Sequence, residues 1–229
     1  MHAHRVIRRL PRACAAAVMA LAAGCSAAAA AGPPPATAVV SAPVTATTAA
    51  VTPADRTDPR TVTAELGIPS IGVTDLPVVP YEGTTDDTAG TRVQDRGVAA
   101  SPYGVDGGVG PGKIGNYLVT AHRLSAGGPF RDLPSLEKGD EVVVTEGGTV
   151  YEYRITETRQ TSFRSERSLA EQRAEVPGEP GAKPAKAMIT LSTCATPEDD
   201  AAGNFWRDAH HNPEHRIDKI GVLVSSRPA

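Results

Sequence analysis

Residues 187–194 read AMITLSTC, an apolar run that ends in a thiol. The turn-rich acidic stretch ATPEDD follows directly at 195–200. An apolar run bounded by a turn signal is typical of a buried strand. We therefore expect Cys194 at the end of a buried strand, where it is either a small core residue or a nucleophile.

Short strands dominate the sequence around this stretch. AELGIPSIGVTDLPVV predicts two strands joined by a tight turn, and GDEVVVTEGGTVYEYRITETRQ predicts a β-hairpin across EGGT. Residues 116–121 predict a strand that ends at His122, and RIDKIGVLVSS predicts another strand. SERSLAEQRAEV predicts a short helix, with a capping box from Ser168 to Glu171. We expect an all-β barrel or sandwich of seven or eight short strands, with one or two short helices and no βαβ units.

Composition limits the classes of function. The chain has 229 residues, of which 40% are hydrophobic, enough for one globular domain with appendages. All four arginines of the leader precede residue 25, and without them 19 basic residues face 26 acidic ones, a net charge of −7. A domain this acidic is a poor candidate for binding nucleic acid or a bare anionic membrane surface.

The N-terminal segment is typical of export. A basic MHAHRVIRRLPR precedes a short apolar run, which predicts a signal peptide over residues 1–24. LAAGC resembles a bacterial lipobox, which makes Cys25 a candidate for lipidation; an uncleaved anchor helix over about residues 13–32 is the alternative. Residues 25–61 are rich in Ala, Thr and Pro and predict a flexible linker, followed by the globular domain at 62–229.

The cysteine count sharpens the question about Cys194. Cys14 leaves with the signal peptide and Cys25 carries lipid, so Cys194 is the one thiol left in an exported protein. Such a thiol is a liability in an oxidising compartment unless it is used or well buried. An inert buried cysteine and a disulfide between Cys25 and Cys194 both remain open on the count alone.

Other motifs have simpler explanations. HHNPEH at 210–215 lacks the spacing and cysteines of a zinc site and reads as a solvated loop. EDD at 198–200 fits a helix N-terminus or a turn better than a calcium site, and GVDGGVGPG lacks the lysine of a phosphate loop. We therefore expect no metal and no cofactor.

The combination of motifs resembles one enzyme family. TLSTC resembles the TLxTC motif of sortases, the cysteine transpeptidases of Gram-positive bacteria. TAHRLSAGGPFRDLPSLEKGDEVVV resembles the segment that contains the sortase histidine, in the style of the class E enzymes of actinobacteria, and LGIPSIGV resembles the first strand of the sortase barrel. The resemblance covers roughly residues 62–226 and implies a closed sortase-type β-barrel.

The resemblance implies a set of site residues. Cys194 would be the nucleophile, His122 the general acid and base, and Arg216 the oxyanion stabiliser, with a bulge needed near Arg216. Arg207 is a rival for the arginine role, but Arg216 is preferred because the apolar run KIGVLV follows it. Thr193 would contribute to the peptide pocket through its hydroxyl or backbone, or would serve only as a strand former.

The implied activity is cell-wall anchoring outside the cytoplasmic membrane. The enzyme would cleave an LPxTG-like or LAxTG-like sorting signal of surface proteins between Thr and Gly, and transfer the acyl group to an amine of a peptidoglycan precursor. Its N-terminal anchor would hold it on the outer face of the membrane. A thiol hydrolase of the same fold and a non-catalytic surface lipoprotein that binds sorting signals are the alternatives.

Overall fold

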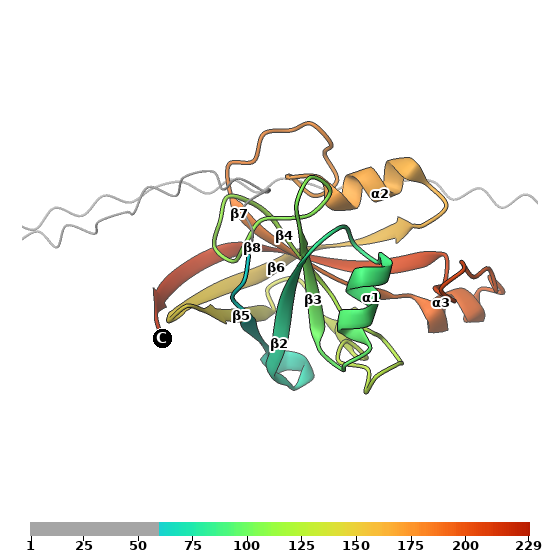
Figure 1. Cartoon of the computed structure of the whole chain (residues 1–229), viewed down its shortest axis with the longest axis horizontal. Helices are drawn as coiled ribbons and strands as arrows, with labels where there is room; N and C mark the ends of the chain where they lie inside the picture. The colour runs from blue at the N-terminus through green and yellow to red at the C-terminus, as the bar shows by residue number, and fades with distance from the viewer. Residues whose placement is uncertain (1–59) are drawn as a thin grey trace, which may run out of the picture. The chain divides into compact units, whose positions relative to one another are not determined.

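Eight strands close into a barrel within residues 60–229, which are the residues that this computed structural model describes (Figure 1). Their order around the barrel is β1-β2-β3-β4-β7-β8-β6-β5, and β5 pairs with β1 to close it. The strands are β1 (Ala64–Ile68), β2 (Val73–Glu82), β3 (Ala99–Tyr103), β4 (Gly115–Thr120), β5 (Glu141–Glu146), β6 (Thr149–Ser162), β7 (Ala187–Cys194) and β8 (His215–Pro228). The closed barrel confirms the predicted fold.

Alternation along the strands decides which side chains fill the barrel. In β1, Ala64, Leu66 and Ile68 are buried, whereas Glu65 between them is exposed. This period of two places every second residue in the interior, because successive strand side chains point to opposite faces. The core cluster draws on most strands of the barrel and includes Leu66, Ile68, Val78, Tyr117, Val119, Val142, Val144, Tyr153, Ile155, Ile189 and Leu191.

The β5–β6 hairpin forms where the sequence predicts it. Glu146 pairs with Thr149, which leaves Gly147 and Gly148 as a two-residue loop. Their φ angles are 58° and 77°, the left-handed values that a tight hairpin turn requires and that glycine adopts without strain. The β-branched residues on either side then extend into the two strands.

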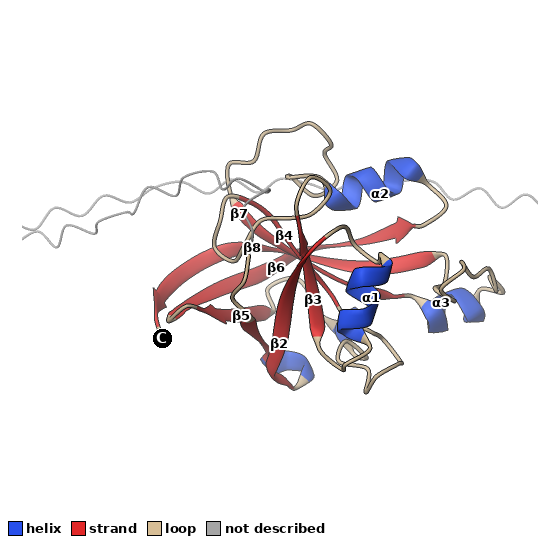
Figure 2. Cartoon of the chain, in the orientation of Figure 1, coloured by secondary structure: helices blue, strands red, loops and turns tan. Residues whose placement is uncertain are grey.

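Three short α-helices lie in the connections: α1 (Thr88–Gln94), α2 (Glu166–Arg173) and α3 (Thr196–Ala201), with 3-10 turns η1 (Pro69–Ile71) and η2 (Leu133–Ser135). Figure 2 shows α1 beside β3, in the crossover from β2 to β3. Because β2 and β3 pair in parallel, this crossover is a small βαβ unit, and the prediction of no βαβ units is wrong. The sequence of α1, TAGTRVQ, is too short and too polar to show a helical period.

Two further expectations need correction. The helix α2 begins after Ser165, whose hydroxyl accepts a hydrogen bond from Ser168 N at 3.2 Å, so Ser168 lies inside the helix and is not its cap. The Ser168 hydroxyl accepts instead from Ser162 N at 2.9 Å. The strands β6 and β8 span 14 residues each, longer than expected, because they pair with one another along nearly their whole length.

The described part of the chain begins with a residue fixed on the barrel. Arg60 donates hydrogen bonds to Val109 O at 3.0 Å and to Ser101 O at 2.8 Å, two residues before the predicted domain start. The signal peptide, the lipidation at Cys25 and nearly all of the linker fall outside the described residues. Within residues 60–229, no helix has the length and apolar character needed to cross a membrane.

Candidate active site

The strand β7 carries Cys194 to the outer face of the barrel. Ile189 and Leu191 point into the core, so Thr190 and Ser192 point outward, and Cys194 follows the same alternation. Cys194 is a free, half-buried cysteine at the last position of the strand. The buried strand that the sequence predicts is present, and it ends with the thiol on the face opposite the core.

The strand β8 places Arg216 beside this thiol. β7 and β8 are antiparallel and in continuous register from Met188↔Val222 to Cys194↔Arg216, so the two residues are direct neighbours across the ladder. The register shifts of β8 lie on its other side, against β6. No bulge is therefore needed between β7 and Arg216, contrary to the expectation.

The strand β4 delivers His122 to the same end of the sheet. β4 and β7 are parallel, and their last paired residues are Thr120 and Ser192. His122 and Cys194 each lie two residues beyond this last pair, so the two residues lie at the same end of the sheet. His122 Nε2 lies 2.9 Å from Asp95 Oδ1, just beyond the end of α1.

Two contacts lock the histidine segment to the cysteine segment. The hydroxyl of Thr193 donates to Ala121 O at 2.8 Å, directly before His122. Arg123 follows His122 and pairs with Glu198 of α3 at 3.2 Å, just after the cysteine strand. Thr193 is 2% exposed, and its hydroxyl joins the end of β7 to the segment that follows β4.

Arg216 is held on several sides by the protein. Its side chain is 1% exposed, and Nε lies 3.3 Å from Oδ2 of Asp86. Its guanidinium carbon lies 4.0 Å from the centroid of the Phe163 ring, a cation–π distance. Nη1 donates to Pro213 O at 3.5 Å and His215 O at 3.3 Å, whereas buried Nη2 has no hydrogen-bond partner within residues 60–229. One donor group of the guanidinium therefore remains unused.

The charges around Cys194 oppose one another. Burial raises the pKa of the Cys194 thiol, the guanidinium of Arg216 lowers it in part, and the carboxylates of Asp86 and Asp208 raise it further. Burial lowers the pKa of Arg216, but Asp86, the cysteine thiolate and Asp218 outweigh this effect and leave it above its ordinary value. The surroundings of Cys194 therefore favour the thiol form over the thiolate, and those of Arg216 favour the charged guanidinium.

A buried polar network lies directly below the Cys194–Arg216 pair. Asp218 is the register partner of Ser192, and its carboxylate accepts from Thr161 at 2.6 Å and from Gln172 at 2.9 Å. Gln172 Oε1 accepts in turn from the hydroxyl of Thr85 at 2.9 Å. Sequence analysis did not identify this network; the available signal was an aspartate inside the apolar run that ends the domain.

The rival arginine lies in another environment. Arg207 forms an ion pair with Asp200 of α3 and donates to the carbonyls of Trp206 at 2.7 Å and Asn204 at 3.4 Å in the α3–β8 connection. Its guanidinium serves this loop, whereas Arg216 stands opposite the thiol. Of the two arginines, Arg216 is the one that pairs with Cys194 across the ladder.

The histidine-rich segment does not act as a unit. His210 and His211 are exposed, whereas Nδ1 of His215 lies 2.7 Å from Oδ1 of Asp199 and joins β8 to α3. Within residues 60–229, no three His, Cys, Asp or Glu side chains gather in a way that could hold a metal ion.

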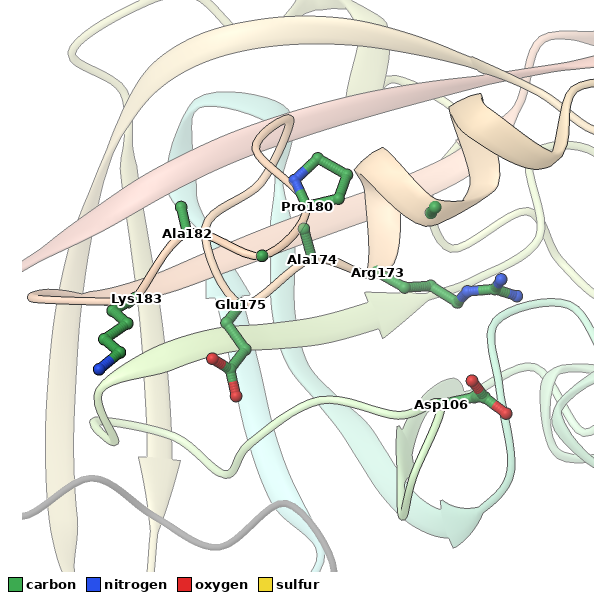
Figure 3. A pocket seen from close by; sticks show the side chains of 9 residues that line it. Asp106, Arg173, Ala174, Glu175, Pro180, Ala182 and Lys183 are labelled. Carbon is green, nitrogen blue, oxygen red and sulfur yellow. The ribbon is translucent and has the colours of Figure 1, made fainter.

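A cavity of about 430 Å³ lies at the C-terminal end of α2, against the segment that leads from α2 to β7. Figure 3 shows its charged side chains, with Asp106 and Arg173 toward one end and Glu175 and Lys183 toward the other. Arg173 donates to the Thr84 hydroxyl at 3.3 Å, which links the cavity wall to the loop that carries Asp86. The cavity therefore adjoins the elements that hold the site.

Thiol, imidazole and guanidinium at the ends of adjacent strands define a site for acyl transfer through a cysteine. The model of the sortase domain family matches residues 66–210. The chain belongs to the sortase family, whose members are cysteine transpeptidases.

Its relatives include sortases of class E. Sortase SrtE1 of Streptomyces coelicolor is 32% identical over 168 residues, which are 72% of this chain and 41% of that protein. The chain thus spans about two fifths of that relative's length. The structure of sortase E from Streptomyces avermitilis is 29% identical, with a TM-score of 0.52 over 72% of this chain and 89% of that one.

Two more structures extend the comparison. Sortase E1 from Streptomyces coelicolor, solved with a tripeptide in its active site, is 25% identical with a TM-score of 0.54 over 77% of this chain and 94% of that one. The SrtA sortase from Actinomyces oris, 21% identical, shares the fold with a TM-score of 0.54 over 73% of this chain and 82% of that one. The expected similarity to class E sortases is confirmed.

Proposed function

We propose that this sortase cleaves an LPxTG-like sorting signal, with preference for the LAxTG variant, between Thr and Gly and transfers the acyl group to an amine of a peptidoglycan precursor. The observation that carries the proposal is the register that sets Arg216 opposite Cys194 and leads His122 to the same strand end. An imidazole and a guanidinium, two groups with complementary chemistry, thus come to the same strand end as a single thiol.

The first half of the reaction makes a thioester. Because burial keeps the thiol protonated at rest, His122 removes its proton as Cys194 sulfur attacks the threonine carbonyl carbon. The carbonyl oxygen becomes an oxyanion, and His122 then gives the proton to the departing glycine amine. The acid Asp95, at the other ring nitrogen, holds the imidazole in orientation during both transfers.

The unpaired guanidinium nitrogen is suited to the oxyanion. Nη2 of Arg216 is buried and has no hydrogen-bond partner within the described residues, an expensive arrangement unless a ligand completes it. A fixed donor that waits for the developing charge lowers the barrier, since no reorganisation is needed during reaction. Arg216 therefore fills the role of oxyanion stabiliser.

The second half of the reaction resolves the thioester. The incoming amine loses its proton to His122, attacks the thioester carbonyl, and releases Cys194 as the thiol. The backbone beside Thr193 remains a candidate wall of the peptide pocket. The tripeptide in the active site of the Streptomyces coelicolor relative supports a peptide substrate here. The protein partners in this reaction are surface proteins with C-terminal sorting signals. Attachment to the outer face of the membrane would occur through Cys25 or an anchor helix.

The test uses the full chain, an LAxTG peptide and a peptidoglycan-like amine. Wild type is expected to form a thioester on Cys194, detected by mass spectrometry without amine, and a ligated product with amine. Cys194→Ala is expected to form neither, and full cleavage by this variant would refute the proposal. If the peptide is released only as the free acid in the presence of amine, the protein is a hydrolase. If the peptide binds but is not cleaved, the protein is a non-catalytic lipoprotein.

Slow alkylation of Cys194 at neutral pH does not separate these functions. Burial raises the pKa of the thiol whether or not the protein is an enzyme. Both an enzyme and an inert lipoprotein are therefore expected to react slowly with an alkylating agent. Only the thioester and its products distinguish them.

A further inference from the structure

We propose that Asp86 is a positioning residue for Arg216, which it holds so that a guanidinium N–H remains directed to the reaction at Cys194. This inference rests on the proposed function and adds a residue that the sequence motifs do not contain. Asp86 lies in the loop between β2 and α1, remote in sequence from both Cys194 and Arg216.

The geometry assigns one carboxylate to the buried guanidinium. Asp86 Oδ2 lies 3.3 Å from Arg216 Nε, and both side chains are buried, with 9% and 1% of their surface exposed. The nearby Asp218 carboxylate accepts from Thr161 and Gln172, and Asp208 accepts from the Asn212 side chain at 3.0 Å. Asp86 is therefore the carboxylate that pairs directly with Arg216.

The contacts on Arg216 divide its donors. Asp86 takes Nε, two backbone carbonyls take Nη1, and the Phe163 ring lies against the guanidinium face. Because a guanidinium is planar and rigid, fixing these atoms also fixes Nη2, the nitrogen with no hydrogen-bond partner within residues 60–229. Asp86 is the one anionic group among these contacts.

The loop is built to hold Asp86 in place. Asp86 has a φ of 62°, a left-handed value that residues other than glycine rarely adopt. Its neighbour Thr85 is anchored on Gln172 at 2.9 Å, and Gln172 is anchored on Asp218, which lies below the active-site pair. On the other side, Asp87 Oδ2 accepts from Thr84 N at 3.0 Å. The loop residue that contacts Arg216 is therefore flanked by anchored neighbours on both sides.

Asp86 acts on the site in two opposite directions. The charged groups that act on the pKa of the thiol are Arg216, Asp86 and Asp208, and His122 follows β4 at the same end of the sheet. The Asp86 carboxylate disfavours the thiolate through its charge, while its hydrogen bond holds the group that stabilises the oxyanion. Removing this one charge should therefore increase the thiolate population and slow the acyl transfer, a combination that a merely structural residue does not produce.

The experiment compares wild type, Asp86→Asn and Asp75→Asn as full-length chains. Asp75 is the matched control because it also has a positive φ, 50°, but is exposed near the start of β2. Alkylation of Cys194 by iodoacetamide is followed against pH by mass spectrometry of its peptide, which separates it from Cys14 and Cys25. In parallel, kcat and KM are measured with the LAxTG peptide.

The inference expects a divided result. Asp86→Asn should alkylate faster than wild type at neutral pH, with a thiol pKa below that of wild type, and its kcat should fall about tenfold or more while KM changes little. Asp86→Glu, which restores the charge, should return the thiol pKa toward wild type and recover part of kcat. Asp75→Asn should match wild type in both assays.

Other outcomes overturn the inference. An unchanged or raised kcat in Asp86→Asn shows that the carboxylate is idle or inhibitory, and an unmoved thiol pKa shows that it does not act at the site. If Asp86→Asn does not fold, Thr85→Val, which removes the anchor on Gln172 but keeps the carboxylate, decides the matter: kcat must fall, or the positioning role is refuted. If wild type itself cleaves no peptide, the proposed function has failed and the positioning role fails with it.

Discussion

Replacing Arg216 by lysine keeps the positive charge but removes the planar fork of donors. The lysine ammonium can still form an ion pair with Asp86, so the buried carboxylate keeps a cationic partner. The two carbonyl contacts of Nη1, at 3.5 and 3.3 Å, are lost. Each contact contributes about 1 kcal/mol or less, so the loss of both lowers the free energy of unfolding by at most about 2 kcal/mol. For a domain of this size that is a fall in Tm of roughly 4 to 8 °C.

The effect on catalysis is expected to be much larger than the effect on stability. Lysine has no second nitrogen to replace Nη2, so the oxyanion loses its fixed donor. Loss of one such donor costs about 100- to 1000-fold in kcat, or about 3 to 4 kcal/mol of transition-state stabilisation. The assay is cleavage of the LAxTG peptide by folded protein, with thermal unfolding measured on the same samples.

Arg207→Lys is the matched control, because Arg207 serves the α3–β8 connection through Asp200 and backbone carbonyls. Its kcat is expected to stay within about twofold of wild type, since surface substitutions of this kind have small effects. If Arg216→Lys retains kcat within tenfold of wild type, the oxyanion role of Arg216 is refuted. If Arg207→Lys shows the larger loss, the two arginines exchange roles.

Two further changes test the groups around the site. Asp95→Asn is expected to lower kcat about three- to tenfold without a change in Tm, because Asp95 orients His122 but is 58% exposed; a kcat equal to that of wild type would contradict this. Burial raises the pKa of Asp218, so the folded state binds a proton at this carboxyl group more readily than the unfolded state does. The stability that this proton contributes is complete below the unfolded pKa of about 3.9 and is lost as pH rises through the folded pKa. Asp218→Asn cannot ionise, so its Tm should equal or exceed that of wild type at neutral pH, and the difference in Tm should be smaller in acid. If the variant is instead less stable than wild type mainly at neutral pH, the hydrogen bonds of the ionised carboxylate outweigh the cost of its burial.

The barrel was predictable from sequence where one face of a strand is apolar. The alternation in β1 and the apolar stretch before Cys194 mark strands, and two adjacent glycines mark the hairpin between β5 and β6. The helix α1 was missed because seven mostly polar residues carry no helical period, and its formation depends on its cap at Asp87 and on packing against β3.

The site was predictable only in part, for a related reason. Cys194 and His122 end strands and belong to motifs, so local sequence identifies them. Asp86, Asp95 and Gln172 come from connections, and their roles depend on contacts with residues 27 to 130 positions away. Spacing along the chain carries no record of such contacts, whereas the closed sheet sets them.

The parallel ladder between β4 and β7 has a consequence for how this enzyme can change. Backbone pairing holds together the strand ends that lead to His122 and Cys194, although 66 residues, 121–186, separate β4 from β7 along the chain. The helix α2 is tied to the site through Gln172, but the segment between α2 and β7 lies outside this ladder. Its length and charge can therefore change while the strand register of the site stays in place.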